Sequence, residues 1–265
     1  MSLPPPPSVP SDREGLLAAV ESALSAVAQL TATISEEQTL LPTPCAGWTV
    51  RDQVAHVTGL ESRFLGRPGP DSHELPPLAH VTNDIQRFME VDVDARRAQP
   101  WPDVQAEAAE VIAARIEQLR GYSFDPNATV ETPFGPRPVA AALSLRAFDA
   151  WAHEQDLRDA LGRPGGMDTP AAAVSIARAA AALGQIGANA GLSESEAVRI
   201  EVPEGPFAFA ASSNPSVTPG ATLRMDAGTF TRLCCGRSSA DKASVVVTGD
   251  EELGRRFLDA MAITP

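Results

Sequence analysis

The sequence predicts an all-α helical bundle followed by a small α+β domain. Apolar residues recur at helical spacing through most of the first 165 residues, and short runs of alternating apolar and polar residues follow from about residue 197. A segment rich in glycine and proline, 163–168, separates the two patterns. The length of 265 residues also suits two domains better than one. We therefore expect a disordered proline-rich tail at 1–10, a helical bundle at 11–165 and an α+β domain at 166–265.

The expected bundle helices are marked by capping residues and by apolar periodicity. Ser11 with Glu14, and Thr49 with Asp52, form capping-box patterns ahead of two periodic segments. Between the second and third helices, the Pro- and Gly-rich stretch 66–80 predicts a long connection, a kind of loop that is often functional. The expected helices run from the first cap to about 34, from the second cap past Leu60, and over 83–97, 103–120 and 138–161.

The C-terminal domain is expected to begin with one long helix at 169–188. Short β-like runs follow it, and two amphipathic helices alternate with them, the first around Phe230 and the second around Phe257. Mixed strands and helices in this order are typical of an α+β domain. The expected strands lie at 198–203, 207–209, 222–225 and 245–248.

Composition narrows the classes of function. The formal charge is −13, and the basic residues are scattered, which disfavours a nucleic-acid or anionic-membrane partner. We find neither an apolar run of 18 residues nor a signal-peptide pattern, and we expect a soluble, cytoplasmic protein. The three cysteines form neither a disulfide framework nor a zinc pattern, which suits a reducing compartment.

Asp149 and His153 are one helical turn apart, so both side chains lie on one face and could hold a cation. The spacing alone leaves a second interpretation open, in which an aspartate merely pairs with a histidine on a helix surface. Asp52 and Asp156 could each orient an imidazole or be ordinary solvated charges. His73 and His80 lie in the proline-rich loop, and we interpret them as solvent-exposed residues outside any ligand set.

The segments TPCAGWTVRDQVAHVTGLESRF at 43–64 and LRAFDAWAHEQDLRDALGRPGG at 145–166 resemble the mycothiol-dependent maleylpyruvate isomerase family of actinobacterial proteins. The middle segment NDIQRFMEVDVDARR and the tail segments LCCGR and VTGDEELGRRFLDAM extend the resemblance over nearly the whole chain. It implies a DinB-like, metal-binding four-helix bundle and a second domain similar to sterol-carrier-protein-like α+β folds. It also implies an enzyme, an isomerase or transferase.

The resemblance further implies a site. The ligand positions of the family fall on His56, Asp149 and His153, and its Gly-Arg pair after a short helix falls on Gly236 and Arg237. The expected metal is zinc, with three protein ligands and an open position, and the expected thiol cofactor is mycothiol. Arg237 is the expected catalytic cation for a substrate carboxylate. Asp149 stands where the best-known isomerase pattern has glutamate, which puts the exact reaction in question.

Two other functions stay open at this point. With water instead of a thiol in the open position, the same ligands would make a metal-dependent hydrolase or amidase. A non-enzymatic protein would bind a small apolar ligand in the C-terminal domain. Arg237 could equally be a surface arginine, whereas the leading hypothesis has it approach the metal from the second domain. The sequence predicts neither the substrate nor the oligomeric state.

Overall fold

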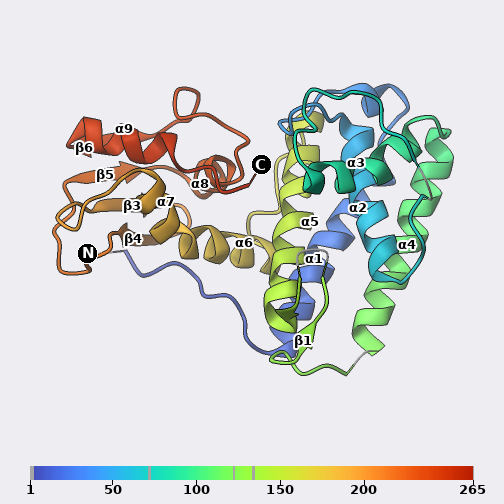
Figure 1. Cartoon of the computed structure of the whole chain (residues 1–265), viewed down its shortest axis with the longest axis horizontal. Helices are drawn as coiled ribbons and strands as arrows, with labels where there is room; N and C mark the ends of the chain where they lie inside the picture. Colours follow the sequence, from blue (N-terminus) through green and yellow to red (C-terminus); the bar gives the residue numbers. More distant parts are fainter. Residues whose placement is uncertain (1–2, 71–72, 122, 133–134, 265) are drawn as a thin grey trace. The chain divides into compact units, whose positions relative to one another are not determined.

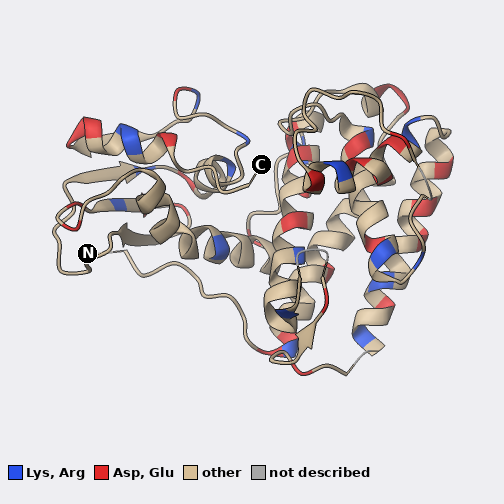
Figure 2. Cartoon of the chain, in the orientation of Figure 1, with Lys and Arg blue, Asp and Glu red and all other residues tan. Residues whose placement is uncertain are grey.

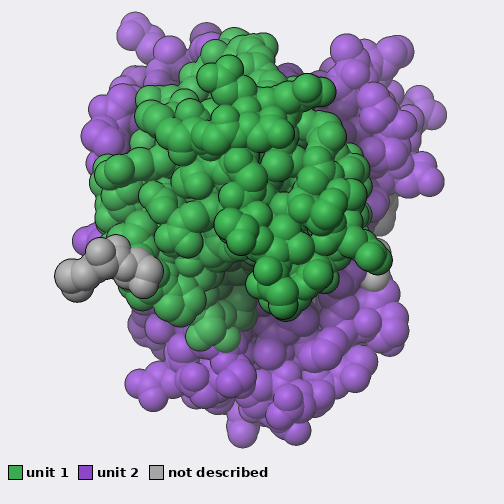
Figure 3. Space-filling model, turned by 90° about the vertical axis from the view of Figure 1, so that its left-hand side faces the viewer, with its two compact units in different colours: residues 1–9, 173–265 green, residues 10–172 purple. Residues whose placement is uncertain are grey.

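The computed structural model describes residues 3–70, 73–121, 123–132 and 135–264, and the chain divides into two compact units (Figures 1 and 3). The helical unit comprises residues 10–172, and the α+β unit comprises residues 1–9 together with 173–265. The expected boundary after residue 165 falls just ahead of helix α6, and the division into domains at that residue stays a prediction.

Among its described residues, the helical unit contains five long helices (Figure 1). Helix α1 packs against α4 and α5, and α2 packs against α3, α4 and α5. Apolar residues at helical spacing explain the packing, because in α1 the buried side chains include Leu16, Val20 and Leu24. The observed bounds are α1 Arg13–Thr31, α2 Val50–Phe64, α3 Asp84–Arg97, α4 Trp101–Gly121 and α5 Val139–Leu161, with a 3-10 turn η1 at Glu37–Leu40.

Local details of these helices differ from the sequence expectations. The cap of α1 is Asp12, whose side chain accepts a hydrogen bond from the Gly15 amide, so the expected capping box at Ser11 is wrong. The long α2–α3 connection is present as expected. Two short strands, β1 (Thr129–Val130) and β2 (Arg137–Pro138), pair antiparallel between α4 and α5 and were not anticipated, because two residues carry no periodicity. Acidic and basic residues are interspersed along the helices (Figure 2).

The expected single helix at 169–188 is wrong. Two helices occupy this segment, α6 (Pro170–Ala181) and α7 (Leu183–Asn189). They are bent relative to each other by 40° at the break. The Ala182 amide donates to both Arg178 and Ala179 carbonyls, a tightened turn that ends α6. Over the described residues, no single helix has the length and apolarity to cross a membrane, although this bent pair meets those two criteria jointly.

A mixed four-stranded sheet forms the centre of the α+β unit (Figure 1). The strand order is β4-β3-β5-β6, in which β3 and β5 are parallel and the outer pairs are antiparallel. Val198, Ile200 and Val202 of β3 are buried, as period-2 alternation predicts. The remaining elements are β3 Val198–Val202, β4 Phe207–Ala211, β5 Ala221–Arg224, α8 Ala227–Cys234, β6 Val246–Gly249 and α9 Glu251–Asp259.

The proline-rich N-terminal segment belongs to the α+β unit. The Pro4 carbonyl accepts a hydrogen bond of 2.7 Å from the amide of Ala208 in β4, which is an edge strand of the sheet. Residues 6–9 lie across a cavity from β4 and helices α6 and α7. The disorder that its composition predicts remains a prediction, and residues 1–2 lie outside the described part of the chain.

Candidate metal centre

Helix α2 is set in place by a capping box. The Thr49 side chain accepts from the Asp52 amide, and the Asp52 carboxylate accepts from the Thr49 amide at 2.8 Å. The Arg97 Nε atom also donates to Asp52, at 2.9 Å. Asp52 is buried and fixes the start of α2, so it is not the solvated charge that one interpretation of the sequence gives, and an orienting role toward His56 stays a prediction. His56 itself is buried in the middle of the helix.

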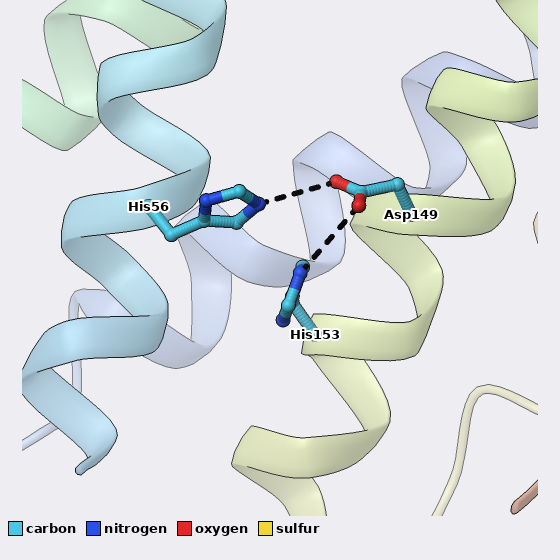
Figure 4. Close-up of side chains that lie close together, drawn as sticks. All are labelled: His56, Asp149 and His153. Carbon is cyan, nitrogen blue, oxygen red and sulfur yellow. Dashed lines mark ion pairs between the residues drawn. The ribbon is translucent and has the colours of Figure 1, made fainter. Parts of the chain in front are cut away.

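The structure brings His56, Asp149 and His153 together (Figure 4). His56 projects from α2, whereas Asp149 and His153 project from successive turns of α5. One ligand atom from each residue lies within 4.8 Å of the other two. His56 Nε2 is 3.5 Å from Asp149 Oδ2, and His153 Nε2 is 3.6 Å from Asp149 Oδ1. The three side chains thus meet around one point inside the helical unit.

These distances suit a shared ion better than direct hydrogen bonds. A hydrogen bond between nitrogen and oxygen spans about 2.7–3.2 Å, and His56 Nε2 is buried without a hydrogen-bond partner among the described residues. Two atoms that each lie about 2.1 Å from a tetrahedral zinc ion are about 3.4 Å apart. Two imidazole nitrogens and one carboxylate are a donor set that zinc accepts, so the residues present fit a divalent ion.

Residues 20–158 match the family model described as the mycothiol maleylpyruvate isomerase N-terminal domain. The match covers more than half of the chain and includes all three clustered residues. The chain belongs to this family. The resemblance noted in the sequence is therefore confirmed.

The chain is also similar to individual proteins and solved structures. The uncharacterized protein Rv0738 of Mycobacterium tuberculosis is 29% identical over 168 residues, which are 63% of this chain and 79% of that protein. The crystal structure of the mycothiol-dependent maleylpyruvate isomerase matches with a TM-score of 0.61 and 16% identity, covering 90% of this chain and 94% of that one. A histidine-to-alanine mutant of that isomerase matches with a TM-score of 0.58. At 16% identity, the two matches to solved isomerase structures show a shared fold.

Gln53 holds His153 in one orientation in this member of the isomerase family. Its Oε1 atom lies 2.5 Å from His153 Nδ1, while its Nε2 atom donates to the Thr43 hydroxyl at 2.8 Å. Because Thr43 in turn donates to the Trp48 carbonyl, the orientation of the Gln53 amide is fixed, with its oxygen toward the imidazole. His153 then carries its proton on Nδ1 and leaves Nε2 for an ion. Asp156 is farther from Nδ1, at 3.6 Å.

Arg146 supports Asp149 from the same helix. Its Nη1 atom donates to Asp149 and its Nε atom donates to Glu61 of α2, which also accepts from Arg115 at 3.1 Å. Two guanidinium groups and two carboxylates therefore balance in charge inside the unit. Sequence reasoning missed both Gln53 and Arg146, although each lies three residues before a clustered residue on the same helix face.

The surroundings shift the pKa values of the two histidines in opposite directions. Burial, reinforced by repulsion from His153, lowers the pKa of His56 to about 4, so His56 is neutral at neutral pH. Burial also opposes protonation of His153, but Asp149 and Asp156 outweigh it and raise the pKa of His153. Burial works against ionisation of Asp149, yet Arg146 and His153 hold its pKa well below the usual range. The cluster thus offers an ionised carboxylate and a neutral imidazole.

The loop histidines are not the solvent-exposed residues that the sequence predicts. His80 Nε2 lies 2.9 Å from Glu90 of α3, and His73 Nε2 lies 2.6 Å from Asp94 of the same helix. Only 20% of the His80 side chain and 27% of the His73 side chain are exposed. Both side chains therefore fasten the loop that follows α2 to α3. Residues 71–72 of this loop lie outside the described residues.

Buried Glu90 links that loop to the cluster. It accepts from Trp48 Nε1 at 2.8 Å and pairs with Arg97 at 2.7 Å, in addition to His80. The Trp48 ring lies 4.9 Å from the ring of His56 and 5.7 Å from that of His153, so it forms one wall of the cluster. Gly47 permits this arrangement, because a Cβ atom there would lie 2.3 Å from His80 Nδ1.

Arg237 lies in the α+β unit, at the turn after α8 where Gly236 has a φ of +65°. It lines a cavity of about 770 Å³ together with Arg232 and Lys242. Its Nη1 atom donates to the Cys235 carbonyl at 3.0 Å. That Arg237 approaches the metal cluster stays a prediction.

Burial and the neighbouring Cys235 raise the pKa of the Cys234 thiol, which agrees with a packing role for Cys234.

Proposed function

We propose that this chain is a metal-dependent enzyme that uses a mycothiol-type thiol and acts on a small, anionic, electrophilic substrate as an isomerase or S-transferase. The single observation that carries the proposal is the cluster of His56, Asp149 and His153 in a chain of the mycothiol maleylpyruvate isomerase family. We also assign α1, α2, α4 and α5 to a DinB-like four-helix core around this cluster, a finer description than the family match requires.

The chain's own residues suit this chemistry. His56 and His153 would present Nε2 to a divalent ion, zinc by our expectation, and Asp149 would present a carboxylate oxygen. When bound, such an ion lowers the pKa of a thiol in its open position, so that the nucleophilic thiolate prevails at neutral pH. Gln53 keeps His153 in the tautomer that can ligate, and Arg146 keeps the Asp149 carboxylate ionised.

The charges at the cluster favour anionic ligands. Arg115, Arg146, Glu61 and Asp149 sum to zero, and Asp156 beside His153 adds one negative charge, so a divalent ion would leave one positive charge uncompensated. A thiolate would neutralise it, and a substrate carboxylate would then need a further cation. We propose Arg237 as the further cation for such a carboxylate, supported by the cationic wall that it forms with Arg232 and Lys242.

Metal content and thiol binding test the proposal. We expect one divalent ion per chain, and the cobalt-substituted protein should gain a thiolate-to-cobalt absorption when mycothiol is added. His56→Ala and His153→Ala should each lose most of the metal, whereas His73→Ala, a control histidine outside the cluster, should keep it. Full metal occupancy in both cluster variants would refute the site. Turnover without any thiol effect would favour a hydrolase.

Arg237 is tested by substrate kinetics. Arg237→Ala should lower kcat/KM strongly, by about tenfold or more for the loss of a charge-assisted hydrogen bond, while metal content and folding stay intact. Arg224→Ala, at an exposed position of β5, is the matched control. If both variants behave alike, Arg237 is a surface arginine.

A further inference from the structure

A small cavity adjoins the metal cluster within the helical unit. Its volume is about 130 Å³, and residues of α2, α3, α5 and the β1–β2 hairpin line it. Asp149, the carboxylate of the cluster, is part of its wall. The rest of the wall is mostly apolar and consists of Leu60, Phe64, Met89, Ala142 and Leu145, with Thr132, Arg137 and Arg146 as the other polar members.

Arg146 is one of the polar residues in the wall of this cavity. Its side chain is only 4% exposed, and its Nε and Nη1 atoms donate to Glu61 and Asp149. The remaining nitrogen, Nη2, is buried and has no hydrogen-bond partner among the described residues. A buried N–H donor without an acceptor costs free energy, and each such group calls for an explanation. An oxygen atom of a molecule in the cavity would supply the missing acceptor.

We propose that this cavity binds an apolar arm of the substrate, an aromatic ring or a branched alkyl group, while Arg146 Nη2 donates to an oxygen atom of the same molecule. The proposal rests on the function proposed above and names its substrate class. An apolar protein cavity of about 150 Å³ can hold benzene, so the cavity has room for a group of about that size. Carbon atoms of Leu60, Phe64 and Met89 would surround it.

The apolar wall argues against a compact dicarboxylate as the occupant. A second carboxylate placed against the Leu60, Phe64 and Met89 side chains would lose its hydration there and gain no partner from them. Burial of a hydrocarbon arm is favourable in proportion to its area. The cavity therefore favours substrates with an apolar group at this position.

Binding of two carboxylates to the zinc-loaded full chain tests the proposal. Benzoate carries a ring and acetate does not, while both offer one carboxylate to the metal or to Arg146. We expect benzoate to bind at least about tenfold more tightly, from the area of the ring alone. In protein labelled with ¹³C at the methionine methyl groups, benzoate should shift the Met89 signal, assigned with Met89→Leu. Equal affinities, or shifts confined to Met225 and Met261, would overturn the proposal.

Filling the cavity provides the matched test. Ala142→Leu should weaken benzoate binding by about tenfold or more and leave acetate binding unchanged, because the added side chain occupies the space for the ring. Ala141→Leu makes the same change at the neighbouring half-buried position outside the cavity wall. The same effect in both variants would contradict the assignment.

Arg146 has its own test. Arg146→Lys keeps the charge but loses the fork of N–H donors, and it should weaken benzoate and acetate alike, by about tenfold. Unchanged affinity for both would remove Arg146 from the proposal.

The same samples separate this proposal from the function on which it rests. If zinc content and thiolate absorption are normal but benzoate gains nothing from its ring, only the cavity assignment fails. If the protein holds no metal but benzoate still shifts Met89, the proposed function fails and the cavity stands.

Discussion

Gln53 illustrates how a neutral side chain can prepare a metal site. Imidazole has two nitrogens, and only the one without a proton can ligate an ion. The amide oxygen of Gln53 accepts from Nδ1 of His153, and the hydroxyl of Thr43 fixes the amide in turn. Selection of the nitrogen thus depends on a chain of hydrogen bonds that begins in the segment before α2.

Gln53→Leu should weaken zinc binding by about 10- to 100-fold, the usual effect of losing a partner that orients a metal-bound histidine. Gln53→Glu, which retains an acceptor oxygen, is the control and should bind zinc more tightly than Gln53→Leu. Competition with a chromophoric chelator measures both affinities, and circular dichroism checks the fold. Identical zinc affinity in wild type and Gln53→Leu would show that Gln53 only fills space.

At the scale of elements, the capping box formed by Thr49 and Asp52 stabilises the start of α2, the helix that carries His56. Thr49→Ala removes an N-cap acceptor and should lower the free energy of unfolding of the helical unit by about 1 kcal/mol. Thr49→Ser keeps the oxygen and should remain within a few tenths of a kcal/mol of wild type. Urea denaturation followed by tryptophan fluorescence measures the difference, because Trp48, Trp101 and Trp151 all lie in the helical unit. Equal losses in both variants would contradict the capping role.

The junction between α9 and the start of β3 should respond to acid. The Ser193 amide and the Arg256 guanidinium donate to Glu196 and lower its pKa to about 2 from an ordinary value of 4.5. A carboxylate whose pKa is lower in the folded state stabilises the fold above the unfolded-state pKa, and loses that contribution as the pH falls toward the folded-state value.

Glu196→Gln should therefore lower the protection of the β3 amides against hydrogen exchange near pH 6, and the difference from wild type should vanish as the pH falls from 4.5 to about 2. Amide hydrogen exchange in β3 reports this unit. Glu204→Gln, at an exposed glutamate between β3 and β4, is the control and should show no such convergence. A constant difference across this pH range would contradict the assignment.

Periodicity and caps predict the helices of this chain well, but they do not predict where a helix bends or which side chains meet. The break at Ala182 carries no proline, the alanine-rich sequence before it suits a continuous helix, and a single glycine such as Gly184 is tolerated inside helices. His56 could be paired with the Asp149 turn only through the family resemblance, because contact between α2 and α5 depends on tertiary packing. The partners of His73 and His80 were missed for the same reason.

At the scale of the whole molecule, metal binding should stabilise one unit selectively. An ion held only by the folded state raises its stability by about 4 kcal/mol at a metal concentration of about 1,000 times Kd. Chelation should therefore lower the unfolding midpoint seen by tryptophan fluorescence, which reports the helical unit alone. Hydrogen exchange in β3 should be less affected. A His56→Ala/His153→Ala double variant, the control, should show no response to the chelator.

The hydrogen bond between Pro4 and Ala208 has a consequence for self-association. An uncovered edge strand offers a row of free amides and carbonyls to which a strand of another molecule can pair. The Pro4 carbonyl occupies one of these groups on β4, and the prolines around it have no amide hydrogen with which to recruit a further strand. Residues 3–7 therefore cover part of the β4 edge, and we expect a Pro4→Ala/Pro5→Ala/Pro6→Ala variant to self-associate more readily than the wild type, as light scattering would show.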